Sequence, residues 1–260
     1  MKPIAVLCAI ALMSMLMAVS PLGFPFSAAK YSAAPQRMLL FNVERNFYDS
    51  SQRLVKTDTG VWTVPLDYNG ERTIREYIEP NHRMQRVECD KHVYCGMPYY
   101  FPVITKLGES FYVDLAGPVF AKNRTFKLIS ENRTITRRIL FFRFTGPSHM
   151  GLIISPREGV TLLGWSFTDR KPHVGVPWGK RATYFVYLSQ GNDMGNWDFW
   201  LEFLVPQGYE QEKPVVDIAF HTYYLQKHEH RQKDFVRFLR ELPEWVHPTA
   251  WSSSSDLYVF

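Results

Sequence analysis

Beyond residue 35 the chain is a succession of short apolar runs separated by turn residues. In the clearest run, residues 197–205, every second side chain is apolar, from Trp197 to Val205. A period of two predicts a strand with one wholly apolar face. Residues 213–224 repeat the pattern after a turn rich in Gly, Gln and Glu, which predicts a hairpin between the two runs.

Further runs of this kind extend over most of the chain. They cover residues 38–43, 60–66, 111–115, 126–130, 134–145, 152–155 and 183–189. Strands at this spacing predict an all-β fold, an antiparallel β-sandwich in a single domain. No low-complexity tract is longer than Ser252 to Ser255, and no strand is predicted over that tract.

One segment departs from the strand pattern. In residues 229–242, the apolar side chains from Phe235 to Leu242 fall at helical spacing, and charged residues occupy the other face. This spacing predicts one C-terminal amphipathic helix, ended by Pro243, that covers an edge or a face of the sheet.

The N-terminal region is apolar. Residues 4–19 form an almost uninterrupted hydrophobic run behind Lys2, which predicts an N-terminal hydrophobic helix. The run is slightly short for a membrane-spanning helix, which needs about 20 residues, yet longer than most signal-peptide cores of about 7–15. Ser27 and Ala29 offer a pattern for cleavage before Lys30. We therefore expect residues 1–29 to be a transmembrane anchor or a signal segment, followed by a domain over residues 30–260.

Cysteine usage indicates an oxidising compartment. Cys8 lies in the apolar segment, so Cys89 and Cys95 are the remaining pair, which predicts a disulfide that pins one loop. A zinc site is the alternative, but zinc needs about four ligands and His92 is the one further candidate nearby.

Two glycosylation sequons agree with that compartment. Asn123 and Asn132 each precede a residue other than proline and then a threonine, the pattern of N-glycosylation in a secretory lumen. Together with the cysteine pair, they predict a lumenal glycoprotein.

Charge and composition narrow the function classes. The chain is 46% hydrophobic and carries a net charge of +5, but its 30 basic and 25 acidic residues are interspersed. Without blocks of one sign, nucleic-acid binding is not indicated. The pairs Arg170-Lys171 and Lys180-Arg181 are expected in solvated turns.

The sequence presents no recognisable catalytic residue, metal ligand or cofactor site. His228 and His230 are two apart and lack a third ligand. Ser148 and His149 are adjacent, so in a strand they face opposite ways and cannot form a nucleophile and base. Nucleophile-elbow, phosphate-loop and dinucleotide patterns are absent from the sequence.

Tryptophans offer a different kind of site. Trp165 and Trp178, in loop-like contexts, could stack on sugars or peptides, although ordinary packing is the favoured interpretation. Trp197 is expected in the core, and Trp200 against a second layer.

Several segments, in order, are similar to one known family. They are FPFS (24–27), PQR (35–37), CDKHVYCGMP (89–98), FKLIS (126–130), FTGPSHM (144–150), WSF (165–167), WLEFLVP (200–206) and LYVF (257–260). The chain from Phe24 onward resembles the C-terminal lumenal part of the endoplasmic reticulum metallopeptidase 1 family. In that family a zinc peptidase domain and a bundle of membrane helices precede this β domain.

The resemblance implies a non-catalytic domain. The metal ligands of the family belong to the peptidase domain, so no catalytic residue carries over to any position here. It implies a retained anchor in residues 4–26 and a place on the lumenal side of the endoplasmic reticulum membrane. The chain is then expected to be either a fragment of a longer gene or a free-standing relative.

Two functions follow as hypotheses. In the first, the chain stabilises or assists a membrane-bound zinc metallopeptidase and uses no cofactor of its own. In the second, it is a secreted module that binds glycans or peptides through Trp165 and Trp178.

Overall fold

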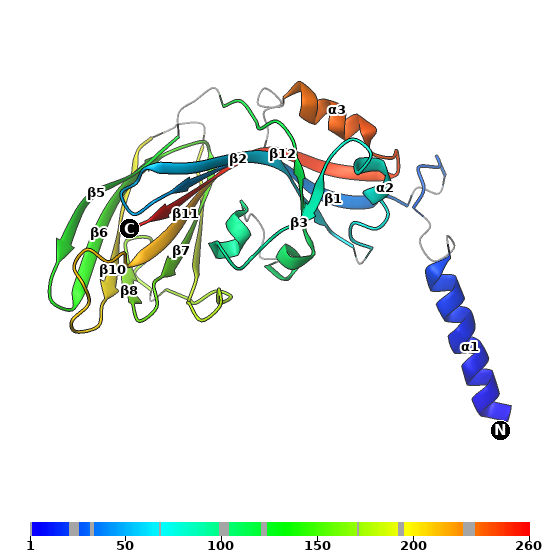
Figure 1. Cartoon of the computed structure of the whole chain (residues 1–260), viewed down its shortest axis with the longest axis horizontal. Helices are drawn as coiled ribbons and strands as arrows, with labels where there is room; N and C mark the ends of the chain where they lie inside the picture. Colours follow the sequence, from blue (N-terminus) through cyan, green and yellow to red (C-terminus); the bar gives the residue numbers. More distant parts are fainter. Residues whose placement is uncertain are drawn as a thin grey trace.

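The computed structural model describes residues 2–20, 26–31, 34–67, 69–98, 104–120, 124–170, 172–191, 195–225 and 232–260. In these residues twelve strands form two sheets, and helices are few (Figure 1). The strands are β1 (Gln36–Tyr48), β2 (Leu54–Pro65), β3 (Met84–Arg86), β4 (Phe111–Asp114), β5 (Thr125–Arg133), β6 (Arg137–Thr145), β7 (His149–Pro156), β8 (Thr161–Trp165), β9 (Tyr184–Ser189), β10 (Trp197–Leu204), β11 (Val216–Tyr224) and β12 (Val246–Val259). The helices are α1 (Lys2–Val19), α2 (Arg75–Ile78), η1 (Val93–Gly96), η2 (Ile104–Glu109) and α3 (Lys233–Glu241).

The large sheet has eight strands in the order β3-β4-β2-β1-β12-β11-β7-β9. Its neighbours are antiparallel except at the centre, where β1 and β12 run parallel from the Gln36–Val246 pair to the Phe47–Leu257 pair. The purely antiparallel prediction is therefore wrong at this one ladder. Because β1 is the first strand of the described β domain and β12 the last, the two ends of the domain close its central sheet.

The small sheet has four antiparallel strands in the order β5-β6-β10-β8. The predicted hairpin between residues 197–205 and 213–224 is wrong, because β10 belongs to this sheet and β11 to the large one. The alternation itself is correct: Phe199, Leu201 and Phe203 are buried. Their apolar face meets β11 across a core rather than beside it in one sheet.

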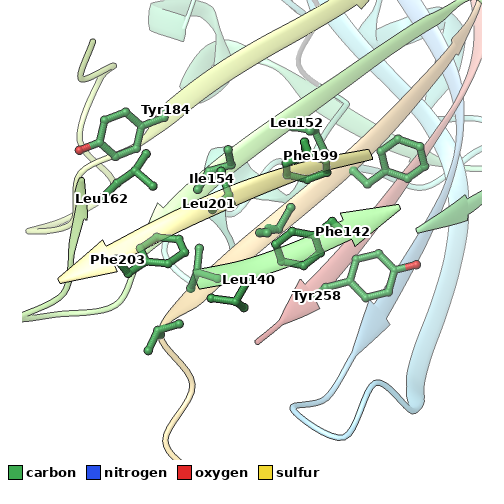
Figure 2. Packing of buried hydrophobic residues seen from close by; sticks show 14 of the residues in the cluster. Leu140, Phe142, Leu152, Ile154, Leu162, Tyr184, Phe199, Leu201, Phe203 and Tyr258 are labelled. Atoms are coloured by element: carbon green, nitrogen blue, oxygen red, sulfur yellow. The ribbon is translucent and has the colours of Figure 1, made fainter. Parts of the chain in front are cut away.

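The two sheets pack face to face over one end of the large sheet. Phe142 and Leu201 from the small sheet lie against Ile154 and Tyr258 from the large sheet in a single buried cluster (Figure 2). The sandwich is therefore partial, since the small sheet covers the end of the large sheet that β12, β11, β7 and β9 form (Figure 1).

Helices cover the other end of the same face. Ala250 packs beneath α3, whereas Tyr258 packs beneath the small sheet. An even separation along a strand places both side chains on one face. Phe235 and Phe238 of α3 are 0% and 1% exposed in that cluster, so the predicted amphipathic helix is confirmed over the residues that the structure describes.

Strand β12 is the main element that the sequence pattern did not predict. Ser252 to Ser255 lie in its middle and are fully buried. The Oγ atoms of Ser254 and Thr222 are 2.7 Å apart, and Ser255 donates to the Gly96 carbonyl at 3.1 Å. The small hydroxyl side chain of Ser255 thus lets the η1 turn approach the centre of the sheet closely.

An N-terminal helix, α1, begins the described chain. Its side chains from Pro3 to Ala18 are exposed. None of the helices in the part of the chain that the structure describes has the length and apolarity to cross a membrane.

Candidate functional site

A cleft lies between the large sheet and the loop that contains Cys89 and Cys95. It consists of two hollows of about 310 and 100 Å³, which share Phe47, Lys91 and His92 in their walls. The larger hollow opens over β1, β2 and β4, and the smaller one reaches Trp178. We call the combined feature the loop cleft.

A disulfide-pinned loop forms one wall of the loop cleft. Cys89 and Cys95 are bonded to each other, and Tyr94 and Cys95 adopt left-handed backbone conformations, with φ values of 47° and 61°. Non-glycine residues adopt that conformation at a cost of about 1–2 kcal/mol each. The turn must therefore be held by its contacts.

Three hydrogen bonds hold this loop. The hydroxyls of Tyr94 and Thr183 are 2.9 Å apart, and Trp178 Nε1 donates to the Cys89 carbonyl at 3.0 Å. The bond from Ser255 to Gly96 anchors the turn to β12. The wall is therefore attached to two parts of the fold, the segment before β9 and strand β12.

The floor of the larger hollow is built around Arg45. Its Nε and Nη2 donate to the two carboxylate oxygens of Asp58 at 2.6 and 3.0 Å. The guanidinium lies 4.5 Å from the ring centre of Tyr112. A Cβ at position 60 would lie 2.6 Å from Tyr112 Cζ, so glycine at position 60 is what lets this ring lie on β2.

The charged side chains that line the loop cleft largely neutralise one another. Lys56 also pairs with Asp58, at 3.1 Å, and Lys91 pairs with Glu88 at 2.8 Å. Burial and the Arg45 charge lower the pKa of His92, so its ring is neutral at neutral pH. The loop cleft offers aromatic walls and paired ions, a surface suited to recognition rather than to proton transfer.

The predicted site residues lie in different places. The Cys89–Cys95 disulfide is present and Cys8 is free and exposed. Asn132 is exposed on β5, whereas Asn123 lies outside the described residues. Within the described ranges, no group of three or more His, Cys, Asp or Glu side chains could hold a metal ion.

The histidines singled out in the sequence do not converge. His228 and His230 lie outside the described residues. His149 Nδ1 is 2.6 Å from the Tyr187 hydroxyl on β9, which is its partner in place of Ser148.

Trp165 and Trp178 are both partly buried against core clusters. The packing interpretation of these two residues therefore holds. The solvated-turn prediction for Arg181 is wrong: its side chain is 15% exposed, donates to the carbonyl of Pro156 at 2.8 Å and pairs with Asp217. Its guanidinium donates to the carbonyl groups of Ser155 and Pro156 at the end of β7.

One buried group was missed by sequence reasoning. Both ring nitrogens of His221 are buried without a hydrogen-bond partner in the described part of the chain, and burial lowers the pKa of this histidine to about 3. The alternation in residues 213–224 was the available signal, since it sets His221 on the same face as Ala219.

Comparison with known proteins assigns the family. Residues 33–258 match the family described as endoplasmic reticulum metallopeptidase 1, C-terminal domain, and the chain belongs to that family. It is 32% identical to human endoplasmic reticulum metallopeptidase 1 over 263 residues, and the match covers 100% of this chain and 28% of that protein.

Other relatives agree. Mouse endoplasmic reticulum metallopeptidase 1 is 31% identical with the same coverage. A putative endoplasmic reticulum metallopeptidase 1-A of Caenorhabditis elegans is 27% identical over 70% of this chain and 21% of its own length. The chain thus spans less than a third of the length of these relatives. A solved yeast delta-COP-I mu-homology domain covers 85% of this chain and 95% of its own at 11% identity, but its TM-score of 0.33 is too low to support an argument.

Proposed function

We propose that this chain is a lumenal accessory domain of the endoplasmic reticulum metallopeptidase 1 family, non-catalytic by itself, that stabilises or assists a membrane-bound zinc metallopeptidase. The observation that carries the proposal is the match of residues 33–258 to the C-terminal domain of that family. The Cys89–Cys95 disulfide and exposed Asn132 support a place in the oxidising lumen.

In this proposal residues 1–29 direct the chain to the membrane and residues 30–260 form the lumenal domain. Support comes from α1, whose exposed apolar side chains have no cover in the described residues. An apolar surface of this kind is stabilised by lipid or by a partner. The loop cleft is the surface that we assign to contact with the peptidase, because its paired ions and aromatic walls suit a protein partner.

Zinc-dependent peptide hydrolysis by the purified full chain tests the non-catalytic part. We expect no stoichiometric zinc by metal analysis and no chelator-sensitive cleavage of a peptide mixture by mass spectrometry. One zinc per chain, together with cleavage that a chelator abolishes, would refute it.

Protein mass and cross-linking in the source cells test the accessory role. A product several-fold heavier than 30.4 kDa would mean that the domain is covalently part of a longer protein. For a product near that mass, cross-linking in intact membranes is expected to capture a zinc metallopeptidase, and capture should weaken in Arg45→Glu. A product near the mass of this chain that forms no cross-link to a peptidase would contradict the assignment.

A further inference from the structure

An aromatic strip runs across the outer face of the small sheet. The register aligns Ser130 with Phe141 and Phe141 with Trp200. Because Leu140 and Phe142 point into the core, the side chains of Ile139 and Phe141 point outward. We call Ile139, Phe141 and Trp200 the outer strip; all three are half-buried.

Trp200 differs from the other tryptophans. Four of the others donate their indole N–H to a protein acceptor: Trp62, Trp165, Trp178 and Trp197. The remaining two, Trp245 and Trp251, contact other aromatic rings. In the described part of the chain, Trp200 has neither a ring partner nor an acceptor for its N–H. Its ring lies over Gly164, where a Cβ would be 3.6 Å from the indole. The position thus holds an open aromatic platform.

Charged side chains border the outer strip, and they neutralise one another as ion pairs. Arg143 donates to Asp198 at 2.6 and 2.7 Å, and Arg137 donates to Glu202 at 2.8 Å. The charges flanking the strip are thus already compensated. A neutral ligand with apolar faces and hydroxyl groups matches it better than a charged peptide does.

A sequon lies on this same face. Asn132 pairs directly with Ile139, and Ile139 with Glu202, so the Asn132 side chain points outward with the outer strip. Directly opposed Cβ atoms are about 5 Å apart and diagonal ones about 7–8 Å, which places Ile139 and Phe141 within reach of the first sugars attached to Asn132. From the strand spacing and the rise per residue, Trp200 is roughly 12 Å away, within reach of the following sugars.

We propose that an N-linked glycan on Asn132 packs across the outer strip, with the apolar faces of its sugars against Phe141 and Trp200. The occupant of this open aromatic face is thus part of the same molecule. The glycan also shields β5, an edge strand whose free backbone groups would otherwise invite pairing with another chain. This inference rests on the proposed lumenal location, because the glycan is added there.

A double-mutant cycle between the glycan and the outer strip tests the proposal. The full chain is produced in a glycosylating host, and intact mass before and after glycosidase gives the occupancy of Asn132. Thermal midpoints are then compared for the glycosylated chain and for Asn132→Gln, each with and without Trp200→Thr or Phe141→Thr. Thr134→Ser keeps both the sequon and the hydroxyl that bonds to Arg137, and it should behave as the parent chain.

We expect the glycan to raise the thermal midpoint by about 2–4 °C in the parent chain and to have no such effect in Trp200→Thr or Phe141→Thr. Val55→Thr, which changes an exposed side chain of the large sheet, should keep the full glycan effect.

Each other outcome overturns the inference. An occupied Asn132 whose glycan effect survives in Trp200→Thr shows that the sugars do not use the strip, while the lumenal location stands. Dimerisation through Trp200, seen by ultracentrifugation with and without the glycan, makes a second copy the occupant. An unoccupied Asn132 removes the ligand itself, and protease sensitivity of the domain in sealed microsomes then shows separately whether the lumenal location also fails.

Discussion

His221 lies in the middle of the large sheet, where its imidazole is fully buried and has no hydrogen-bond partner within the described residues. Gly151 and Ser255 face it from the two neighbouring strands. Burial lowers its pKa to about 3, whereas an unfolded histidine titrates near 6.5. The folded protein therefore holds this residue neutral.

The pH dependence of stability follows from that difference. A group with a depressed folded pKa contributes full stability above its unfolded pKa and loses it as pH falls toward the folded value. We expect His221 to lower the free energy of unfolding by about 2 kcal/mol between pH 6.5 and pH 5. Urea titrations over that range should show the slope in the parent chain and a flatter dependence in His221→Phe. Equal slopes in the two proteins would contradict the assignment.

Among single elements, the disulfide loop depends most clearly on contacts from elsewhere in the fold. Its turn is left-handed at Tyr94 and Cys95, and it is attached to β12 and to Trp178. Because the closed loop is short, the disulfide restricts the unfolded chain only modestly.

Replacing both cysteines measures this contribution. We expect Cys89→Ser/Cys95→Ser to lose roughly 2 kcal/mol of unfolding free energy while the domain stays folded. Limited proteolysis should then cut within residues 85–97 first. Cys8→Ser is the matched control, because that thiol is free and exposed, and it should leave both measurements unchanged. A complete loss of folding would mean that the loop organises the whole domain.

Comparing β10 with β12 shows how much of the fold the sequence could predict. The apolar alternation of β10 arises because one face meets a core and the other meets solvent, so the pattern is local. In β12 the buried residues are serines whose hydroxyls are satisfied by Thr222 and Gly96, far away in sequence. No local pattern reports such a partner, and the strand was missed.

The same reason limits prediction of the candidate site. The disulfide between Cys89 and Cys95 was predictable from the sequence, and the loop that it closes forms one wall of the loop cleft. The floor of its larger hollow depends on Gly60 and on ion pairs between strands. Arg181 was misjudged likewise, because its partner Asp217 comes from another strand.

For the whole molecule, a buried polar network ties the large sheet to the start of the small one. Arg124 precedes β5, and its side chain pairs with Asp256 of β12 at 3.0 Å and with Glu44 of β1. Asn46 donates to Asp256 at 2.8 Å. Burial raises the pKa of the Asp256 carboxyl, and the Arg124 charge opposes that shift. The network fixes the segment at which the chain passes from one sheet to the other.

Removing one partner of this network should lower the free energy of unfolding substantially. We expect Arg124→Met to lose about 3–5 kcal/mol, because it leaves the Asp256 charge buried and unpaired. Adding Asp256→Asn removes that charge, keeps an acceptor for Asn46 and should recover part of the loss in urea titrations. Arg143→Met, which breaks an exposed pair with Asp198, should hardly move the midpoint. A double variant less stable than Arg124→Met alone would argue against the charge as the cause.

The lumenal location of the domain is the central claim, and protease protection in sealed microsomes from cells expressing the full chain tests it most directly. The account predicts that the domain survives protease until detergent is added, and that glycosidase treatment produces a mobility shift that decreases in Asn132→Gln. Digestion without detergent, with no shift on glycosidase treatment, would place the domain on the cytosolic side and contradict the account.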